Sequence, residues 1–210
     1  MAPRELQRVL SALEEEGLLL AADARLPSVT TLVAGEPVRG SWWGHAAGER
    51  IYAVLDALSE HPAATSVKLV SRKVTFVHAE LWPELLAIGS AGEPWQLSRL
   101  DVRGRDLLVA VEREGELRLD RFTAERGGPA RPWLDAAKEL ERRLLAHAGQ
   151  EHTGSGAHTR LLTSWGRWAR ERRLSHGRSS AADARSRFEG IVDRWRADHG
   201  GRPTLPWPTE

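Results

Sequence analysis

The chain of 210 residues contains no cysteine, one methionine, one tyrosine and three phenylalanines. Without cysteine it can form no disulfides, no thiolate nucleophile and no cysteine-ligated metal site. It also has no apolar run long enough to cross a bilayer and no signal-peptide pattern at its start, so we expect a cytoplasmic protein without membrane association. GxGxxG, P-loop and GxSxG motifs are absent as well. The sequence therefore leaves open whether the protein is an enzyme.

The charge that the chain does carry is unevenly distributed. Residues 1–120 hold 13 Lys and Arg against 18 Asp and Glu, whereas residues 121–210 hold 17 against 11. The two parts thus have net charges of −5 and +6, within a total of +1. This asymmetry is typical of a polyanion-binding protein with its contact surface in the second half. It is equally typical of two domains that dock on each other within one chain.

Apolar periodicity predicts an α+β protein that is mostly helical. Residues at helical spacing predict helices over 3–16, 48–59, 79–88, 102–114, 133–145, 163–174 and 181–198. The segment 28–33 fits either a short helix capped by Ser28 or a strand. Two small β-hairpins are predicted, one from segments 67–70 and 74–77 and the other from 146–153 and 157–162.

The stretch 107–162 carries the most information about the fold. It runs through an apolar helix, a tight turn at Gly115, a short element, a third helix and a hairpin. In this order it resembles the winged helix-turn-helix superfamily. There the third helix commonly enters the major groove and the wing contacts phosphates or the minor groove, so the resemblance implies DNA contacts by Lys138, Arg142, Arg143 and Arg160. The same module also serves in protein interactions.

We therefore expect three parts. These are an N-terminal helical and hairpin module over 1–98, a winged-helix module over 99–164 and an arginine- and tryptophan-rich helical C-terminal arm over 165–210. A helix followed by a hairpin occurs in both of the first two modules, although their sequences show no clear repeat.

The predicted C-terminal arm combines arginines with indoles. Its candidate nucleic-acid-binding residues are Arg167, Arg170, Arg172 and Arg173, with Trp165, Trp168 and Trp195 interleaved. Such an arm could lie along a phosphate backbone and stack on bases. We favour the other interpretation, in which the tryptophans dock on the rest of the protein, because Trp165 and Trp168 are three residues apart and share one helical face.

A second cluster, Trp42, Trp43 and His45, lies between glycines. The indoles could form the wall of a pocket in which His45 exchanges a proton. The favoured alternative is that the indoles fasten the loop to the core and His45 caps the helix that begins near Gly48. His78, at the end of a predicted strand, could face His45, but a lone histidine there is more often structural.

The tandem modules give a second resemblance. The chain is similar to bacterial DNA glycosylases built from tandem winged helices, in its helix-and-hairpin modules and its basic, tryptophan-rich character. Those enzymes carry a Gln-x-Gln element. This chain lacks it, since its glutamines are Gln7, Gln96 and Gln150. Base excision by this chain would instead need His45, Glu49 or His78 to position the water.

Histidines in the predicted wing raise the question of a metal. His147, His152 and His158 occur there with Glu151, but no HxxxH or HExxH spacing is present, so we expect no metal and no other cofactor. The leading prediction is binding of double-stranded DNA, in repair or regulation. A glycosylase-like repair enzyme and a protein-interaction adaptor are the alternatives, and the oligomeric state is open.

Overall fold

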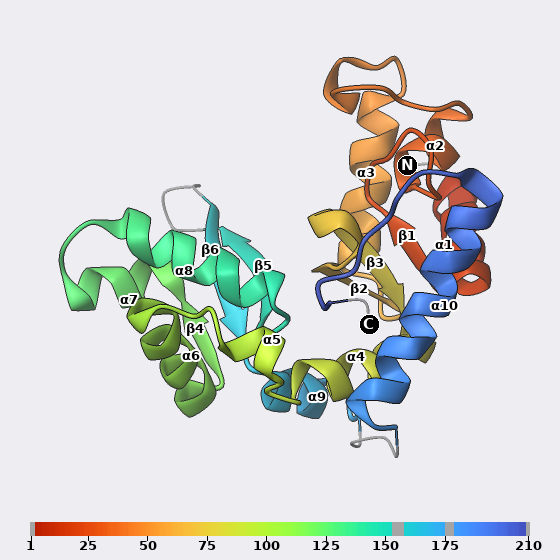
Figure 1. Ribbon diagram of the computed structural model, residues 1–210. Coiled ribbons are helices and arrows are strands. Elements are labelled where there is room, and N and C mark those ends of the chain that lie inside the picture. Colours follow the sequence, from red (N-terminus) through yellow and green to blue (C-terminus); the bar gives the residue numbers. More distant parts are fainter. Residues whose placement is uncertain (1–2, 153–157, 175–178, 209–210) are drawn as a thin grey trace. The chain divides into compact units, whose positions relative to one another are not determined.

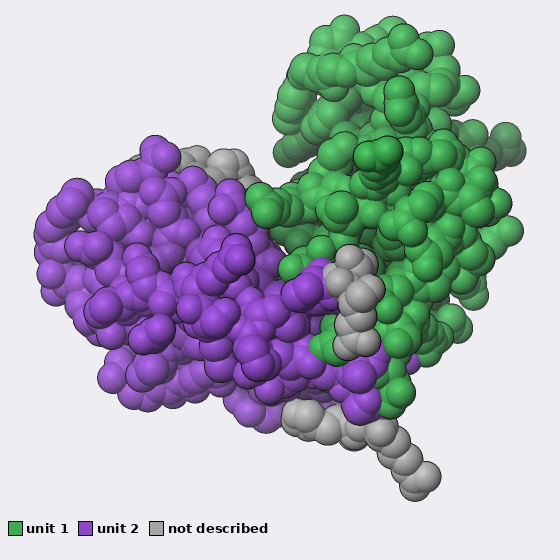
Figure 2. Space-filling model, in the orientation of Figure 1, with its two compact units in different colours: residues 1–82, 183–206 green, residues 83–182, 207–210 purple. Residues whose placement is uncertain are grey.

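The computed structural model describes residues 3–152, 158–174 and 179–208, and it divides into two compact units (Figure 1, Figure 2). Unit 1 comprises Met1–Trp82 and Asp183–Pro206, and unit 2 comprises Pro83–Ala182 and Trp207–Glu210. The predicted fold class, α+β and mostly helical, is confirmed. Within the described residues no helix is long and apolar enough to span a membrane.

Unit 1 is built on a three-stranded antiparallel sheet in the order β1-β3-β2. Its elements are α1 (Pro3–Glu16), β1 (Leu18–Leu20), α2 (Val29–Ala34), η1 (Trp42–Gly44), α3 (Gly48–Ser59), β2 (Ala64–Lys68), η2 (Val70–Arg72), β3 (Val74–His78), η3 (Ala79–Leu81) and, from Asp183 onward, α10 (Ala181–His199). β2 and β3 form the predicted hairpin. β1, which sequence periodicity did not indicate, pairs with β3 so that Leu19 lies opposite Phe76.

Local signals set the helix ends in unit 1. Gly17 has a φ of 76° and follows α1, as a left-handed cap residue does. Ser28 caps α2, since its Oγ accepts a hydrogen bond from the Thr31 amide at 3.3 Å, and this resolves the ambiguous segment as a helix. The core beneath these helices contains Val9, Leu13, Leu19, Val29, Ile51, Val54, Leu58 and Phe76.

Unit 2 contains a second three-stranded antiparallel sheet, in the order β4-β6-β5. Its elements are, from Pro83 onward, α4 (Trp82–Gly89), α5 (Pro94–Leu97), α6 (Val102–Glu114), β4 (Glu116–Arg118), α7 (Leu119–Arg126), α8 (Ala130–Arg142), β5 (His147–His152), β6 (His158–Thr163) and α9 (Trp165–Glu171). β5 and β6 form the predicted hairpin, whose turn over 153–157 lies outside the described residues. β4 was not predicted and pairs Leu117 with Leu162.

The helix ends in unit 2 correct the predicted bounds of two helices. α6 ends before Gly115, whose φ is 77°, as expected. α8 begins three residues earlier than predicted, directly after Pro129, and ends at Arg142 because Leu144 adopts a φ of 52° outside the helical region. α9 is shorter than the predicted helix over 163–174, since Thr163 belongs to β6.

The two units share one order of elements. Each runs helix, strand, helix, helix, strand, strand, from α1 to β3 in unit 1 and from α6 to β6 in unit 2 (Figure 1). In each sheet the last strand lies in the middle, between the strand that follows the first helix and the strand that follows the third helix. α3 and α8 are therefore equivalent third helices, each leading into a hairpin.

The C-terminal residues are divided between the units and do not form the separate arm predicted over 165–210. α9 belongs to unit 2 and most of α10 to unit 1, where Trp195 is buried and its Nε1 donates to Glu16 at 2.8 Å. By sequence, unit 1 holds 13 basic and 14 acidic residues, and unit 2 holds 17 and 15. The net charges are −1 and +2, so the folded units lack most of the asymmetry between the two halves of the chain.

Candidate nucleic-acid interface

The solvent-facing side of α8 carries alternating charges. Arg131, Asp135, Lys138 and Arg142 lie at positions i, i+4, i+7 and i+11, which places them along one side of the helix. Asp135 accepts from Arg131 at 3.0 Å and from Lys138 at 3.3 Å, which lowers its pKa, the Arg131 hydrogen bond being the larger cause. Arg142 lies 3.6 Å from Glu139. Ion pairs at the surface contribute little net stability, so the three cations can exchange carboxylate partners for phosphates at little cost.

Arg143, in contrast, makes side-chain contacts within unit 2. Its side chain is 14% exposed, and its Nε donates to Glu139 at 2.6 Å while Nη1 donates to the carbonyl of Trp95. Gln96, fully buried, donates from Nε2 to the carbonyls of Ile88 at 3.2 Å and of Arg143 at 3.0 Å. These contacts fasten α5 to the end of α8, so Arg143 is not available for a phosphate in this conformation.

Arg160 also makes an ion pair within unit 2. It comes from β6 and forms an ion pair with Glu141 of α8, and the two side chains are 19% and 12% exposed. Removing one member of a half-buried pair leaves the other without a partner. Of the four DNA contacts implied by the winged-helix resemblance, Lys138 and Arg142 therefore face solvent, whereas Arg143 and Arg160 hold unit 2 together.

In the segment containing α9 the indoles are buried, whereas some of the cations are exposed. Trp165 and Trp168 are buried, with ring centroids 5.2 Å apart, and Trp165 Nε1 donates to the Leu144 carbonyl at 2.7 Å. Neither ring offers a face for base stacking, which agrees with the favoured docking interpretation. Gly89 lies so close to Trp165 that an added Cβ would meet Cε2 at 2.3 Å.

The four arginines of this segment differ in availability. Arg167 pairs with Glu171 at 2.7 Å and with Glu116 at 3.2 Å, and the hydrogen bond to Glu171 is the main cause of its raised pKa. Arg172 lies over the Trp168 ring at 4.5 Å, and burial lowers its pKa. Arg170 and Arg173 are exposed, and neither side chain has an ion-pair partner in the part of the chain that the structure describes.

The predicted pocket around Trp42 and Trp43 is instead an outward-facing stack. The two rings are 4.2 Å apart at 23°, and Trp43 also contacts Tyr52 of α3 at 5.5 Å. His45 Nδ1 accepts from the Ala47 amide at 3.1 Å, at the start of α3, and its Nε2 lies 3.5 Å from Glu36. The favoured interpretation holds only in part, because Trp42 packs on the core whereas Trp43 is exposed, and the N-cap residue of α3, Ala47, makes no side-chain cap.

The three candidate catalytic residues do not meet in one site. His45 and Glu49 lie at the start of α3, whereas His78 pairs with Ala64, which follows the end of α3. The 12 residues of α3 separate these positions by about 18 Å at 1.5 Å per residue. His78 Nδ1 is buried and has no hydrogen-bond partner among the described residues.

A cavity of about 310 Å³ lies in unit 2 where β4 meets α7. Its lining mixes three carboxylates with two guanidinium groups and is formed by Glu114, Glu116, Leu117, Arg118, Arg121, Phe122, Glu125 and Leu161. Nearby, Asp120 accepts from Arg118, which with Thr159 lowers its pKa to about 2. This balance of charges is not that of an anion pocket.

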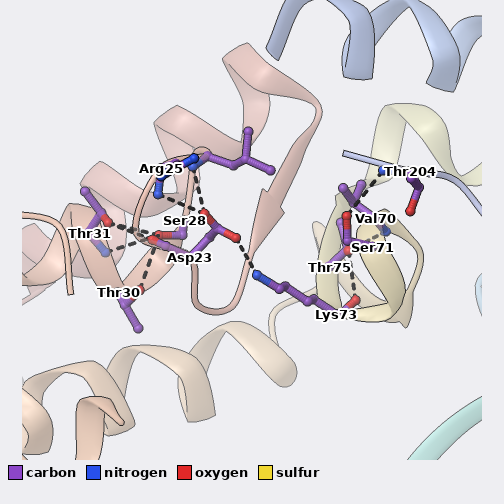
Figure 3. Close-up of polar contacts among 11 residues, drawn as sticks. Asp23, Arg25, Ser28, Thr30, Thr31, Val70, Ser71, Lys73, Thr75 and Thr204 are labelled. Carbon is purple, nitrogen blue, oxygen red and sulfur yellow. Dashed lines mark hydrogen bonds and ion pairs between the residues drawn. The ribbon is translucent and has the colours of Figure 1, made fainter. Parts of the chain in front are cut away.

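Polar contacts fix the hairpin turn of unit 1 (Figure 3). Ser71 adopts a φ of 51°; its amide donates to the Thr204 carbonyl at 2.7 Å and its Oγ accepts from the Thr204 amide at 3.3 Å. Lys73 donates to Asp23 at 2.6 Å. Burial works to raise the pKa of Asp23, but hydrogen bonds from the Leu26 and Arg25 amides and from Lys73 lower it overall. Arg72 is left exposed at the turn.

The predicted wing histidines are only partly described. His147 packs 5.8 Å from Trp168 and 6.1 Å from Trp165, and burial lowers its pKa to about 3. The side chains of Glu151, His152 and His158 lie outside the described residues, among which no three potential ligands gather for a metal.

No family model, curated protein or solved structure matches this chain.

Proposed function

We propose that the protein binds double-stranded DNA through α8 of unit 2. The observation that carries the proposal is the row of Arg131, Lys138 and Arg142 on the exposed side of the third helix. The order from α6 to β6 supports it, because this is the stretch that resembles the winged helix, whose third helix commonly enters the major groove. A helix of this width fits the major groove of B-DNA.

Phosphate contacts would supply most of the affinity. Asp135, the partner of Arg131 and Lys138, is exposed, and Glu139, the half-buried partner of Arg142, also pairs with Arg143, so a DNA phosphate can replace these carboxylates without leaving a buried charge unpaired. Arg170 and Arg173 add two exposed cations in the same unit. Binding by such a set falls steeply as salt concentration rises, because each phosphate contact releases counterions.

The test is the double variant Lys138→Glu with Arg142→Glu, measured by fluorescence anisotropy on duplex DNA over a series of salt concentrations. Affinity should fall at least about tenfold, and the slope of log affinity against log salt should decrease by about 2, one for each lost phosphate contact. Arg143 is left unchanged, since its replacement would disturb α5.

A matched control reverses two exposed arginines on α10 of unit 1, Arg194→Glu with Arg196→Glu. This control changes net charge by the same amount and should alter affinity less than about threefold, because long-range charge effects are screened. Equal losses in both variants, or full affinity of the α8 variant with unchanged circular dichroism, would contradict the proposal. His45, Glu49 and His78 do not converge, so base excision is not part of it.

A further inference from the structure

The most unusual surface of unit 1 is formed by three aromatic side chains, Trp42, Trp43 and Tyr52, called here the aromatic surface. Trp43 is 66% exposed and Tyr52 is 51% exposed. Trp42 is partly buried and packs against the core, so it serves as the base on which Trp43 stacks. Exposing an indole to water forfeits the burial energy of a large apolar ring, and contiguous exposed apolar groups commonly mark interaction sites.

The backbone holds the aromatic surface in place. The amide of His45 donates to the Trp42 carbonyl at 3.1 Å, and the Gly48 amide donates to the His45 carbonyl at 2.8 Å. A Cβ on Gly48 would lie 3.0 Å from the Trp43 carbonyl oxygen, so the loop passes close over the start of α3. Trp43 is therefore preorganised, although the fold does not bury its outer face. Preorganisation reduces the entropy lost on binding.

Carboxylates surround the aromatic surface. Glu49 and Asp56 are three residues before and four residues after Tyr52, so they lie on the same side of α3, and both are exposed. Glu36 lies beside His45. Across residues 35–60 the sequence has four acidic and two basic residues, and one of the basic residues, Arg50, is paired with Glu5. This part of the surface repels phosphate and attracts cations.

We propose that the aromatic surface docks an arginine- or lysine-bearing segment of a partner protein. A guanidinium or ammonium group can lie on the outer face of Trp43, where the ring quadrupole attracts it. Glu49 and Asp56 are placed to accept hydrogen bonds from the same or a neighbouring cation. The site lies in unit 1, whereas the proposed DNA contacts are in unit 2, so the two proposals can fail independently.

The experiment titrates the full chain with a fluorescein-labelled peptide of alternating arginine and glycine, at low salt. Trp43→Ala should weaken peptide binding about tenfold, and Tyr52→Ala or Asp56→Asn should weaken it about threefold. Val109→Ala, which trims an exposed apolar side chain in unit 2, is the matched control and should leave binding unchanged. A glutamate and glycine peptide should not bind. Duplex DNA affinity should be unaffected by Trp43→Ala.

Three results would overturn the proposal. Peptide affinity that survives Trp43→Ala and Tyr52→Ala, with both variants folded, would place cation binding elsewhere, for instance on the acidic run Glu14 to Glu16. Tighter binding of oligothymidylate, lost in Trp43→Ala, would assign the surface to single-stranded bases. Sedimentation showing a dimer that dissociates in Trp43→Ala would assign it to a second copy of this chain.

Discussion

Units 1 and 2 share the order of their elements but differ in the exposed side chains of the equivalent third helix. On α3 these include Glu49, Arg50, Tyr52 and Asp56, whereas on α8 they include Arg131, Asp135 and Arg142. The shared order places a helix with one face in solvent in both units. What that helix can bind is decided by its exposed side chains and not by the fold.

The units also differ in how they use tryptophan. Both units bury tryptophans, Trp133, Trp165 and Trp168 in unit 2 and Trp82 and Trp195 in unit 1, but unit 1 also displays Trp43. The buried indoles contribute to stability, whereas the exposed indole of unit 1 is free to contribute to recognition. Substitutions in the two sets should separate these effects.

The largest effect should come from Trp165→Ala. The ring is buried, packs on Gly89 and Trp168, and donates a hydrogen bond to Leu144, so its removal leaves a cavity and an unpaired carbonyl. The free energy of unfolding should fall by about 3–5 kcal/mol. Urea denaturation followed by circular dichroism measures it, with Trp43→Ala as the control expected to change by less than about 0.5 kcal/mol. Similar losses in both variants would refute the division of roles.

The next effect is a pH dependence that belongs to unit 2. His147 has an ordinary pKa of 6.5 when unfolded and about 3 when folded, because the folded protein buries it and places Arg172 nearby. Above pH 6.5 it is neutral in both states and contributes nothing. As the pH falls below 6.5, only the unfolded state takes up the proton, so stability should decrease by up to about 2 kcal/mol between pH 7 and pH 5.

His147→Phe keeps the ring contact with Trp168 and removes the titrating group. The variant should lose less stability than the native chain between pH 7 and pH 5, as measured by urea denaturation at both values. Asp120 titrates in a different window, because its lowered pKa stabilises the fold above about 3.8 and this contribution is lost as the pH falls towards 2. An unchanged pH dependence in His147→Phe would mean that His147 is accessible to protons in the folded state.

A third test gives the third helix of unit 1 the charge of the exposed cations on the third helix of unit 2. Glu49→Lys with Asp56→Lys gives α3 exposed cations like those of α8, and neither residue makes an ion pair in the described structure. If the shared element order is sufficient to present a helix to DNA, duplex affinity at low salt should rise about three- to tenfold. Anisotropy titration of the variant measures the gain. No gain would show that side chains outside α3 prevent unit 1 from approaching the duplex.

Sequence periodicity predicted much of this fold, because several boundaries are encoded locally. The helices over 48–59 and 102–114 were predicted with the observed ends, since Gly115 and the apolar spacing are local signals. The strands β1 and β4 were missed because each is only three residues long and its partner is distant in sequence, Leu117 pairing with Leu162. Pairing between short segments that are far apart in the sequence produces no periodic pattern of apolar residues.

The candidate sites were less predictable, because availability depends on tertiary contacts. Lys138 and Arg143 look alike in sequence, but only Arg143 is held by α5. The pairing of Arg160 with Glu141 joins a strand to a helix and has no sequence signature. The exposure of Trp43 was equally hidden, because composition counts indoles without stating which are buried.

The smallest effect compares the helix caps of the two units. Ser28 in unit 1 is buried, accepts from the Thr31 amide and donates to the Asp23 carbonyl at 2.8 Å, whereas Asp101 in unit 2 is exposed and accepts from Gly104 at 2.7 Å. Ser28→Ala should cost about 1–2 kcal/mol and Asp101→Ala about 0.5–1 kcal/mol. Ser41→Ala is the control, since Ser41 precedes η1 without a capping hydrogen bond. Urea midpoints rank the three, and a larger loss for Asp101→Ala than for Ser28→Ala would mean that burial does not set the strength of these caps.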